Sequence, residues 1–197
     1  MARGKNGNVK CQWFTTLRFN SMDELKTKNG SKNRSNSFAC EKILCARQNI
    51  QGKIKVLEII KVIKISASNN RVFTALTSSE EIPTFYPLEK VDSKWELGSE
   101  VLYKGEINGA PFTDFGVIEK LESPKVYAYR YWSDNHGTER TPENHLTISY
   151  VLSECPDGTE LTVTQSNIKS EEMYELMETQ VWDYLLGSLE EFVEAHT

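Results

Sequence analysis

The sequence predicts an α+β fold in which a curved antiparallel sheet packs around one long C-terminal helix. Two alternating apolar runs follow Asn144 and are joined by the turn Pro156-Asp157-Gly158, as is typical of paired strands. From Ser170 the period becomes helical for about seven turns at 3.6 residues per turn. Short turns also separate the upstream strands, and short connections indicate antiparallel pairing.

The first part of this fold is predicted to be a strand followed by two short helices. Residues 54–66 (IKVLEIIKVIKIS) combine β-branched residues with lysines, which favours a long strand. Ser68 and the asparagines after it are expected to cap a helix whose apolar face holds Val72, Phe73 and Leu76. A second short helix is expected between 78 and 87, with its apolar end pointing inward.

A meander of strands is predicted next. Turn pairs at Gly98-Ser99, Asn108-Gly109 and Ser123-Pro124 divide this region. Strands are expected near 101–107, 112–122, 125–133, 145–154 and 159–166.

The final helix should then bury a broad apolar stripe. The stripe comprises Met173, Met177, Val181, Tyr184, Leu185, Ser188, Leu189 and Phe192.

Charge divides the chain of 197 residues in two. Residues 1–53 hold eleven Lys/Arg against three Asp/Glu, and residues 54–197 hold twelve against twenty-five, giving +8 and -13. The first segment lacks a sustained apolar period, which favours a disordered N-terminal extension before a domain at 54–197. A basic arm for acidic partners and an organellar transit peptide are the functional interpretations of this segment, and a tail without a function is the third.

Several classes of protein are disfavoured. The chain has no run of 18 apolar residues and no apolar segment after its N-terminal charges, so neither a membrane span nor secretion is indicated. The negative charge of the domain repels nucleic acid. The four cysteines lack the spacing of a zinc site, and a reduced, cytoplasmic protein is expected.

Catalytic chemistry has few candidates. Asp134 and His136 could form a general-base pair at a cavity mouth or be solvated turn residues. Arg130 could hold a ligand carboxylate, provided that its face of the strand 125–133 points inward together with Trp132. The alternative is that the tyrosines of the same strand point inward. Gln165 and Ser166 are expected to cap the last helix.

The segments LYKGEINGAPFTDFGVIEKLESPKVYAYRYW and NHLTISYVLSECPDGTELTVTQSN resemble a known family. They are similar to the C-terminal domain type of the activators of the heat shock protein 90 ATPase, within the START-like (SRPBCC) superfamily. VIKISASNNRVFTALTSSEEIPTFYP is similar to the opening of that domain, so the resemblance covers about 54–195. It implies a helix-grip fold with a cavity between the sheet and the last helix.

We therefore expect a non-enzymatic START-like domain, with no cofactor or metal, that binds a small hydrophobic ligand. A pocket of at least about 300 Å³ is expected. Its candidate residues are Phe85, Tyr86, Trp95, Tyr129, Arg130, Trp132, Tyr150, Met177 and Tyr184. The alternative is a stress-response interaction module that acts on a chaperone ATPase, and an enzyme is the third interpretation. The sequence predicts no oligomeric state.

Overall fold

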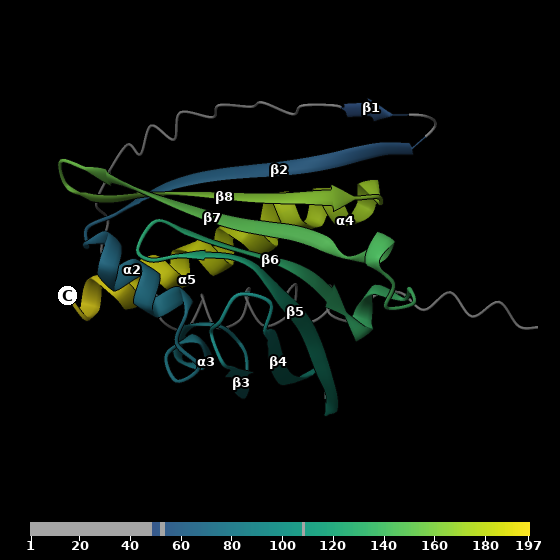
Figure 1. Ribbon diagram of the computed structural model, residues 1–197, viewed down its shortest axis with the longest axis horizontal. Coiled ribbons are helices and arrows are strands. Elements are labelled where there is room, and N and C mark those ends of the chain that lie inside the picture. Colours follow the sequence, from purple (N-terminus) through teal and green to yellow (C-terminus); the bar gives the residue numbers. More distant parts are fainter. Residues whose placement is uncertain (1–48, 52–53, 108) are drawn as a thin grey trace, which may run out of the picture.

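The computed structural model describes residues 49–51, 54–107 and 109–197. Among these residues, eight antiparallel strands form a curved sheet in the order β1-β2-β8-β7-β6-β5-β4-β3 (Figure 1). The strands are β1 (Asn49–Gln51), β2 (Ile54–Ile65), β3 (Lys90–Ser93), β4 (Glu100–Ile107), β5 (Ala110–Glu122), β6 (Val126–Ser133), β7 (Leu146–Cys155) and β8 (Gly158–Ile168). The predicted α+β class and the antiparallel meander are confirmed. The short strand β3 was not predicted.

The first long strand lies beside the last one. β2 pairs antiparallel with β8, and Ile63 is opposite Leu161. β3 to β8 pair in chain order, and the connection from β6 to β7 is the longest, with the 3₁₀ turns Asp134–His136 and Pro142–Asn144. The strand pairs therefore join consecutive strands except for the closing pair of β2 and β8. Of the predicted extension 1–53, only Asn49–Gln51 belongs to the described residues, where it pairs with the start of β2. The prediction for the remainder lies outside them.

Two short helices follow β2, as predicted. α2 (Asn69–Leu76) begins after Ser68, whose hydroxyl accepts a hydrogen bond from the Arg71 N–H at 3.3 Å. This bond satisfies one of the free amide groups at the start of the helix. α3 (Ile82–Phe85) is a single turn, and both helices contact the last helix.

The last helix runs along one face of the sheet and contains a π turn (Figure 1). It consists of α4 (Glu171–Leu176), the π turn η3 (Met177–Val181) and α5 (Trp182–Ala195). Ser170 caps it and accepts a hydrogen bond from the Met173 N–H at 3.2 Å. The Trp182 N–H bonds to the Met177 carbonyl, five residues back, so the turn contains one residue more than an α-turn.

The π turn corrects the predicted apolar stripe. Beyond it, the buried positions of α5 are Trp182, Leu186, Leu189 and Val193. The predicted Tyr184 instead lies at the surface and is 38% exposed. The extra residue of the π turn rotates the side chains that follow it. A pattern that assumes an unbroken α-helix therefore includes Tyr184 and omits Trp182, Leu186 and Val193, whereas the predicted Leu189 is buried.

The core lies between the sheet and this helix. In β7, alternate residues from Leu146 to Leu152 are buried, and β8 buries alternate residues from Thr159 to Gln165. Alternation of this kind places one face of each strand against the helix and leaves the other in solvent. Large hydrophobic side chains with substantial exposure are few among the described residues. They are Ile60, Val62, Leu97, Val151 and Tyr184.

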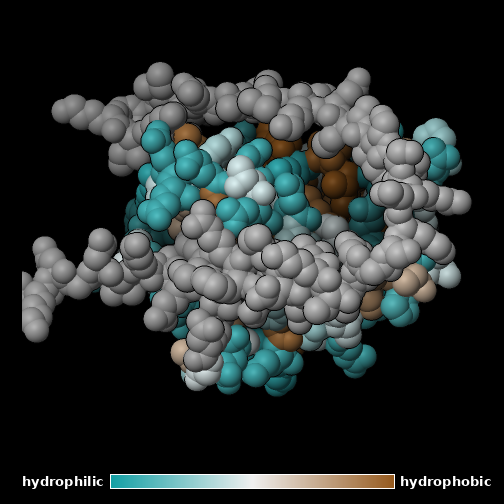
Figure 2. Space-filling model, turned by 180° about the vertical axis from the view of Figure 1, so that it is seen from behind, coloured by the Kyte–Doolittle hydropathy of each residue, from teal (hydrophilic) through white to brown (hydrophobic). Residues whose placement is uncertain are grey.

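On the side opposite to that of Figure 1, the largest visible group of hydrophobic residues lies beside an area of hydrophilic residues (Figure 2). No helix among the described residues has the length and apolar character that crossing a membrane would require.

Candidate functional site

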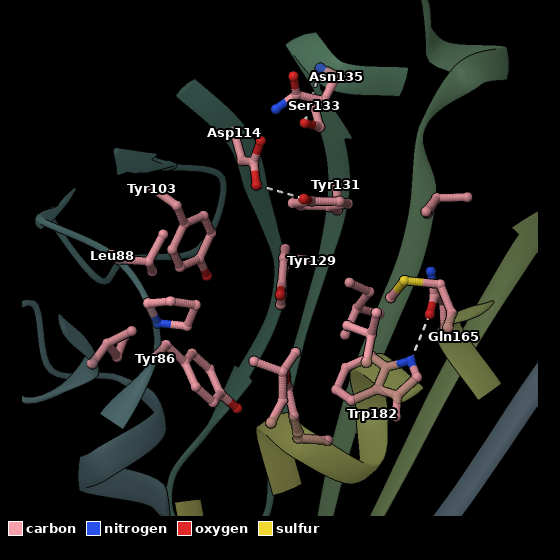
Figure 3. Close-up of a pocket in the computed structure, with 18 of the residues that line it drawn as sticks. Tyr86, Leu88, Tyr103, Asp114, Tyr129, Tyr131, Ser133, Asn135, Gln165 and Trp182 are labelled. Atoms are coloured by element: carbon pink, nitrogen blue, oxygen red, sulfur yellow. Dashed lines mark hydrogen bonds between the residues drawn. The ribbon is translucent and has the colours of Figure 1, made fainter. Parts of the chain in front are cut away.

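A cavity lies between the concave face of the sheet, the π turn and the loop after α3 (Figure 3). Its volume is about 120 Å³. Most of its lining is hydrophobic or aromatic, and six tyrosines contribute to it. The tyrosines are Tyr86, Tyr103, Tyr127, Tyr129, Tyr131 and Tyr150. The rest of the apolar lining comes from Leu76, Ile82, Pro87, Leu88, Leu146, Ile148, Met173, Met177, Val181, Trp182 and Leu185.

The cavity is smaller than the 300 Å³ predicted, because tyrosine rings occupy the interior. The rings of Tyr127 and Tyr129 stack with centroids 5.0 Å apart, and those of Tyr127 and Tyr150 are 5.8 Å apart. The hydroxyls of Tyr103 and Tyr127 are 3.2 Å apart in the same group. Burial raises the pKa of Tyr127, Tyr129 and Tyr150 well above the ordinary value, so these phenols stay neutral.

Four of the nine predicted ligand residues line the cavity. They are Tyr86, Tyr129, Tyr150 and Met177. Two others pack behind its wall. The Phe85 ring contacts Phe192 with a centroid distance of 4.9 Å, and the Trp95 indole N–H donates to the Ser79 hydroxyl at 3.0 Å.

The remaining three predicted residues lie away from the cavity. Arg130 is on the outer face of the sheet, where its Nε is 2.7 Å from Glu119 Oε1 and its side chain is 41% exposed. Trp132, on the same face, packs on Phe115 with ring centroids 5.8 Å apart. Tyr184 is on the solvent side of α5. Of the two strand faces considered, the tyrosine face of β6 therefore points inward, which removes Arg130 as a partner for a ligand in the cavity.

One end of the cavity is polar, and its central residue was not predicted. Asp114 of β5 is 4% exposed and accepts a 2.6 Å hydrogen bond from the Tyr131 hydroxyl (Figure 3). Burial raises the pKa of Asp114 to about 6, while the Ser133 and Tyr131 hydroxyls oppose this rise. The sequence does hold a signal that could have identified Asp114. It lies two residues from Phe112 and four from Ile118, so strand alternation places this acidic residue on the same buried face of β5.

His136 lines the cavity at this polar end. It is one of the two residues that the sequence suggested as a general-base pair at a cavity mouth. It belongs to η1 (Asp134–His136), and its Nδ1 accepts a hydrogen bond from the Ser133 N–H at 3.4 Å. Burial lowers the pKa of His136 to about 4, so the ring is neutral near pH 7. Asp134 is exposed and does not line the cavity. The acid that faces the cavity near His136 is Asp114.

Gln165 forms a second polar contact, between sheet and helix. It was predicted to cap the last helix, but Ser170 fills that role. Gln165 is fully buried, and its Oε1 accepts a 2.6 Å hydrogen bond from the Trp182 indole N–H. Its Nε2 has no hydrogen-bond partner among the described residues.

Metal-binding clusters are not found in the described part of the chain, where no three His, Cys, Asp or Glu residues gather to hold an ion. Two properties characterise the cavity: its volume is small and its walls are aromatic, and a few buried polar atoms lie at fixed positions. This combination suits binding and orientation of a small molecule.

Several solved structures resemble the chain. A protein from Cytophaga hutchinsonii, determined in solution, is 28% identical and has a TM-score of 0.62, with 74% of this chain and 98% of that one covered. A protein from Nitrosomonas europaea is 15% identical, with a TM-score of 0.60 and coverage of 75% and 98%. The Aha1 dimer from Colwellia psychrerythraea is 22% identical, with a TM-score of 0.56 and coverage of 70% and 96%.

Comparison with curated protein sequences finds no match. The family model described as "Activator of Hsp90 ATPase homolog 1-like protein" matches residues 66–194. This range begins directly after β2 and reaches into the last turn of α5, so it contains the cavity and both of its polar contacts. The chain therefore belongs to the family of Activator of Hsp90 ATPase homolog 1-like proteins.

Proposed function

We propose that the protein binds a small hydrophobic ligand, about the size of one six-membered ring, in the tyrosine-lined cavity, and that it does so without catalysis. The volume of about 120 Å³ carries this proposal. An apolar cavity of about 150 Å³ engineered into another protein binds benzene, so the space here suits a molecule of that class. Lipids and sterols are too large for it.

Apolar burial would supply most of the affinity, at about 25 cal/mol per Å² of surface removed from water. A one-ring ligand has little surface to bury. We therefore expect a Kd between about 1 µM and 1 mM. Toluene is a suitable probe because it has the right size and no polar group.

Filling the cavity tests the proposal. Ile148 lines it from β7 and is buried, whereas Val151 lies on the outer face of the same strand and is 40% exposed. Ile148→Phe should weaken toluene binding at least tenfold in an NMR titration, while the matched Val151→Phe should leave it unchanged. Met177→Trp fills the same space from the helix and covers the case in which Ile148→Phe does not fold.

Equal toluene affinity in the filled variants and the wild type would overturn the proposal, as would the absence of binding to the wild type. Native mass spectrometry of the purified full chain adds an independent measurement. A co-purifying molecule of one-ring size would support the proposal. A bound lipid would contradict the volume on which it depends.

A second candidate is an interaction with a chaperone ATPase, in keeping with the family description. Acidic side chains of the last helix face solvent. They are Glu171, Glu172, Glu175, Asp183, Glu191 and Glu194. ATPase turnover of the chaperone with and without saturating protein tests this candidate, and unchanged turnover would contradict it. Lysine substitutions at Glu191 and Glu194 should remove any activation if this face makes the contact.

A further inference from the structure

The polar end of the cavity has an unused hydrogen-bonding group. Asp114 Oδ2 accepts the hydrogen bond from the Tyr131 hydroxyl, but its second oxygen, Oδ1, has no partner among the described residues. Buried polar atoms are nearly always paired, and an ionised carboxylate accepts about four hydrogen bonds. Asp114 lines the cavity, with the Ser133 hydroxyl as a second polar neighbour, so a ligand there lies beside this carboxylate.

Two other unpaired polar atoms belong to residues that line the cavity. They are the Tyr86 hydroxyl and Gln165 Nε2, which are both buried without a hydrogen-bond partner among the described residues. Asp114 differs from them because it can carry a charge. Figure 3 shows the three groups on different sides of the cavity, so a single small molecule would meet Asp114 at one end.

The charges around Asp114 favour a donor over an anion. None of the residues that line the cavity is Lys or Arg, and no lining cation therefore balances the carboxylate. The Tyr103 and Tyr129 rings lie 6.1 Å apart on the cavity wall, and those of Tyr129 and Tyr131 lie 6.3 Å apart in edge-to-face orientation. The faces of such rings attract cations. His136, the titratable neighbour from η1, has its pKa lowered by burial and contributes no positive charge near pH 7.

We propose that Asp114 and Tyr131 form a subsite that binds a hydrogen-bond donor, an ammonium or hydroxyl group, at the polar end of a one-ring ligand. The Asp114 carboxylate accepts the hydrogen bond from the ligand, and the Tyr131 hydroxyl holds that carboxylate in place. The subsite rests on the proposed function, because a ligand must first enter the cavity. It adds a chemical class: amines and alcohols are selected, and carboxylic acids are excluded.

A matched series of ligands tests the subsite. Toluene, benzyl alcohol, benzylamine and benzoate share one ring and differ in the attached group. At pH 8, benzylamine and benzyl alcohol should bind the full-length chain at least tenfold more tightly than toluene, and benzoate should bind least. Asp114→Asn should reduce the ratio of benzylamine affinity to toluene affinity at least tenfold. The exposed neighbour Asp134→Asn is the control and should leave this ratio unchanged.

The wild-type chain provides a second measurement if Asp114→Asn does not fold. Lowering the pH from 8 to 5 protonates Asp114, so the preference for benzylamine over toluene should fall at least tenfold. Toluene binding with no preference for the donors, or a preference that survives both Asp114→Asn and pH 5, would overturn the subsite while leaving the proposed function intact. Failure of toluene and all three polar ligands to bind would overturn both.

Discussion

The indole N–H of Trp182 donates a 2.6 Å hydrogen bond to Oε1 of Gln165, and both side chains are buried. Trp182 is the first residue after the π turn, and Gln165 lies in β8 between Ile59 of β2 and Ile148 of β7. This contact joins the helix to the middle of the sheet beside the cavity. It therefore sets the position of the wall that Met177 and Val181 contribute.

The Gln165–Trp182 hydrogen bond should show coupling in a double-mutant cycle. Gln165→Leu and Trp182→Phe each leave a buried polar atom without its partner, which costs about 1–3 kcal/mol. The double variant leaves neither atom, so its loss of unfolding free energy should be smaller than the sum of the single losses by at least about 0.5 kcal/mol. Urea unfolding measures all four chains. Additive losses would show that the bond contributes nothing specific.

Asp114 should destabilise the protein above pH 6. Its pKa is raised from 3.8 to about 6 in the folded state, so folding favours the neutral carboxyl group. The unfolding free energy is therefore unaffected by this group below about pH 4, where the carboxyl is neutral in both states, and it falls as the pH rises through 6. A shift of about two units corresponds to about 3 kcal/mol. Asp114→Asn should therefore be more stable than the wild type by up to about 3 kcal/mol at pH 8 and equally stable near pH 4, as measured by urea unfolding.

Comparing the wild type with Asp114→Asn separates the effect of Asp114 on stability from the effects of its titratable neighbours. His136 has the opposite effect, because its pKa is lowered to about 4 and stability falls as the pH drops from about 6.5 towards that value. Tyr131 and Ser133 stay neutral, and Asp134 is exposed. All four residues are present in both chains, so their contributions largely cancel. A stability difference that is the same at pH 4 and pH 8 would contradict a raised pKa for Asp114.

Gly116 should be required for the shape of the cavity. A Cβ at this position of β5 would lie 3.1 Å from Cδ2 of the Tyr129 ring. Gly116→Ala should therefore displace the ring, lower the free energy of unfolding by about 1 kcal/mol and weaken toluene binding at least fivefold. The matched control is Gly187→Ala on α5, where a Cβ meets nothing within 4 Å. There, alanine should raise stability by about 0.5–1 kcal/mol, without effect on binding.

Arg130 should be dispensable for binding. Its ion pair with Glu119 is on the outer face of the sheet, and such exposed pairs contribute about 0–1 kcal/mol. Arg130→Ala should therefore change stability by less than about 1 kcal/mol and leave the affinity for toluene and benzylamine unchanged in the same titrations. A tenfold loss of affinity would contradict the inward position of the β6 tyrosines.

The sequence allowed most of the fold to be predicted because its turn signals are strong and local. Pro156-Asp157-Gly158, Asn108-Gly109 and Ser123-Pro124 separate strands whose lengths then follow from their alternation. The Ser68 hydroxyl caps α2 as expected, whereas Ser170 caps the last helix in place of the predicted Gln165 and Ser166. The strand β3 has only four residues and no such signal, so its pairing with β4 depends on tertiary contacts that the sequence does not display.

The candidate site was harder to predict for two physical reasons. In β6 both faces carry large side chains, since Trp132 and Arg130 alternate with tyrosines, and a period of two does not say which face is inside. The π turn is a local departure from helical geometry, and the sequence of α4 and α5 gives no obvious signal for it. The first ambiguity admitted Arg130 and Trp132 to the predicted site, and the second admitted Tyr184.

The aromatic rings beside Trp182 allow ligand binding to be followed by intrinsic fluorescence. The Tyr150 and Trp182 rings are 6.2 Å apart, and Tyr150 stacks on Tyr127. At such separations, excitation absorbed by the phenols passes efficiently to the indole. A ligand bound next to these rings would change both the energy transfer to the indole and the polarity of its surroundings. Intrinsic emission thus offers a label-free way to screen a chemical library against the unmodified chain.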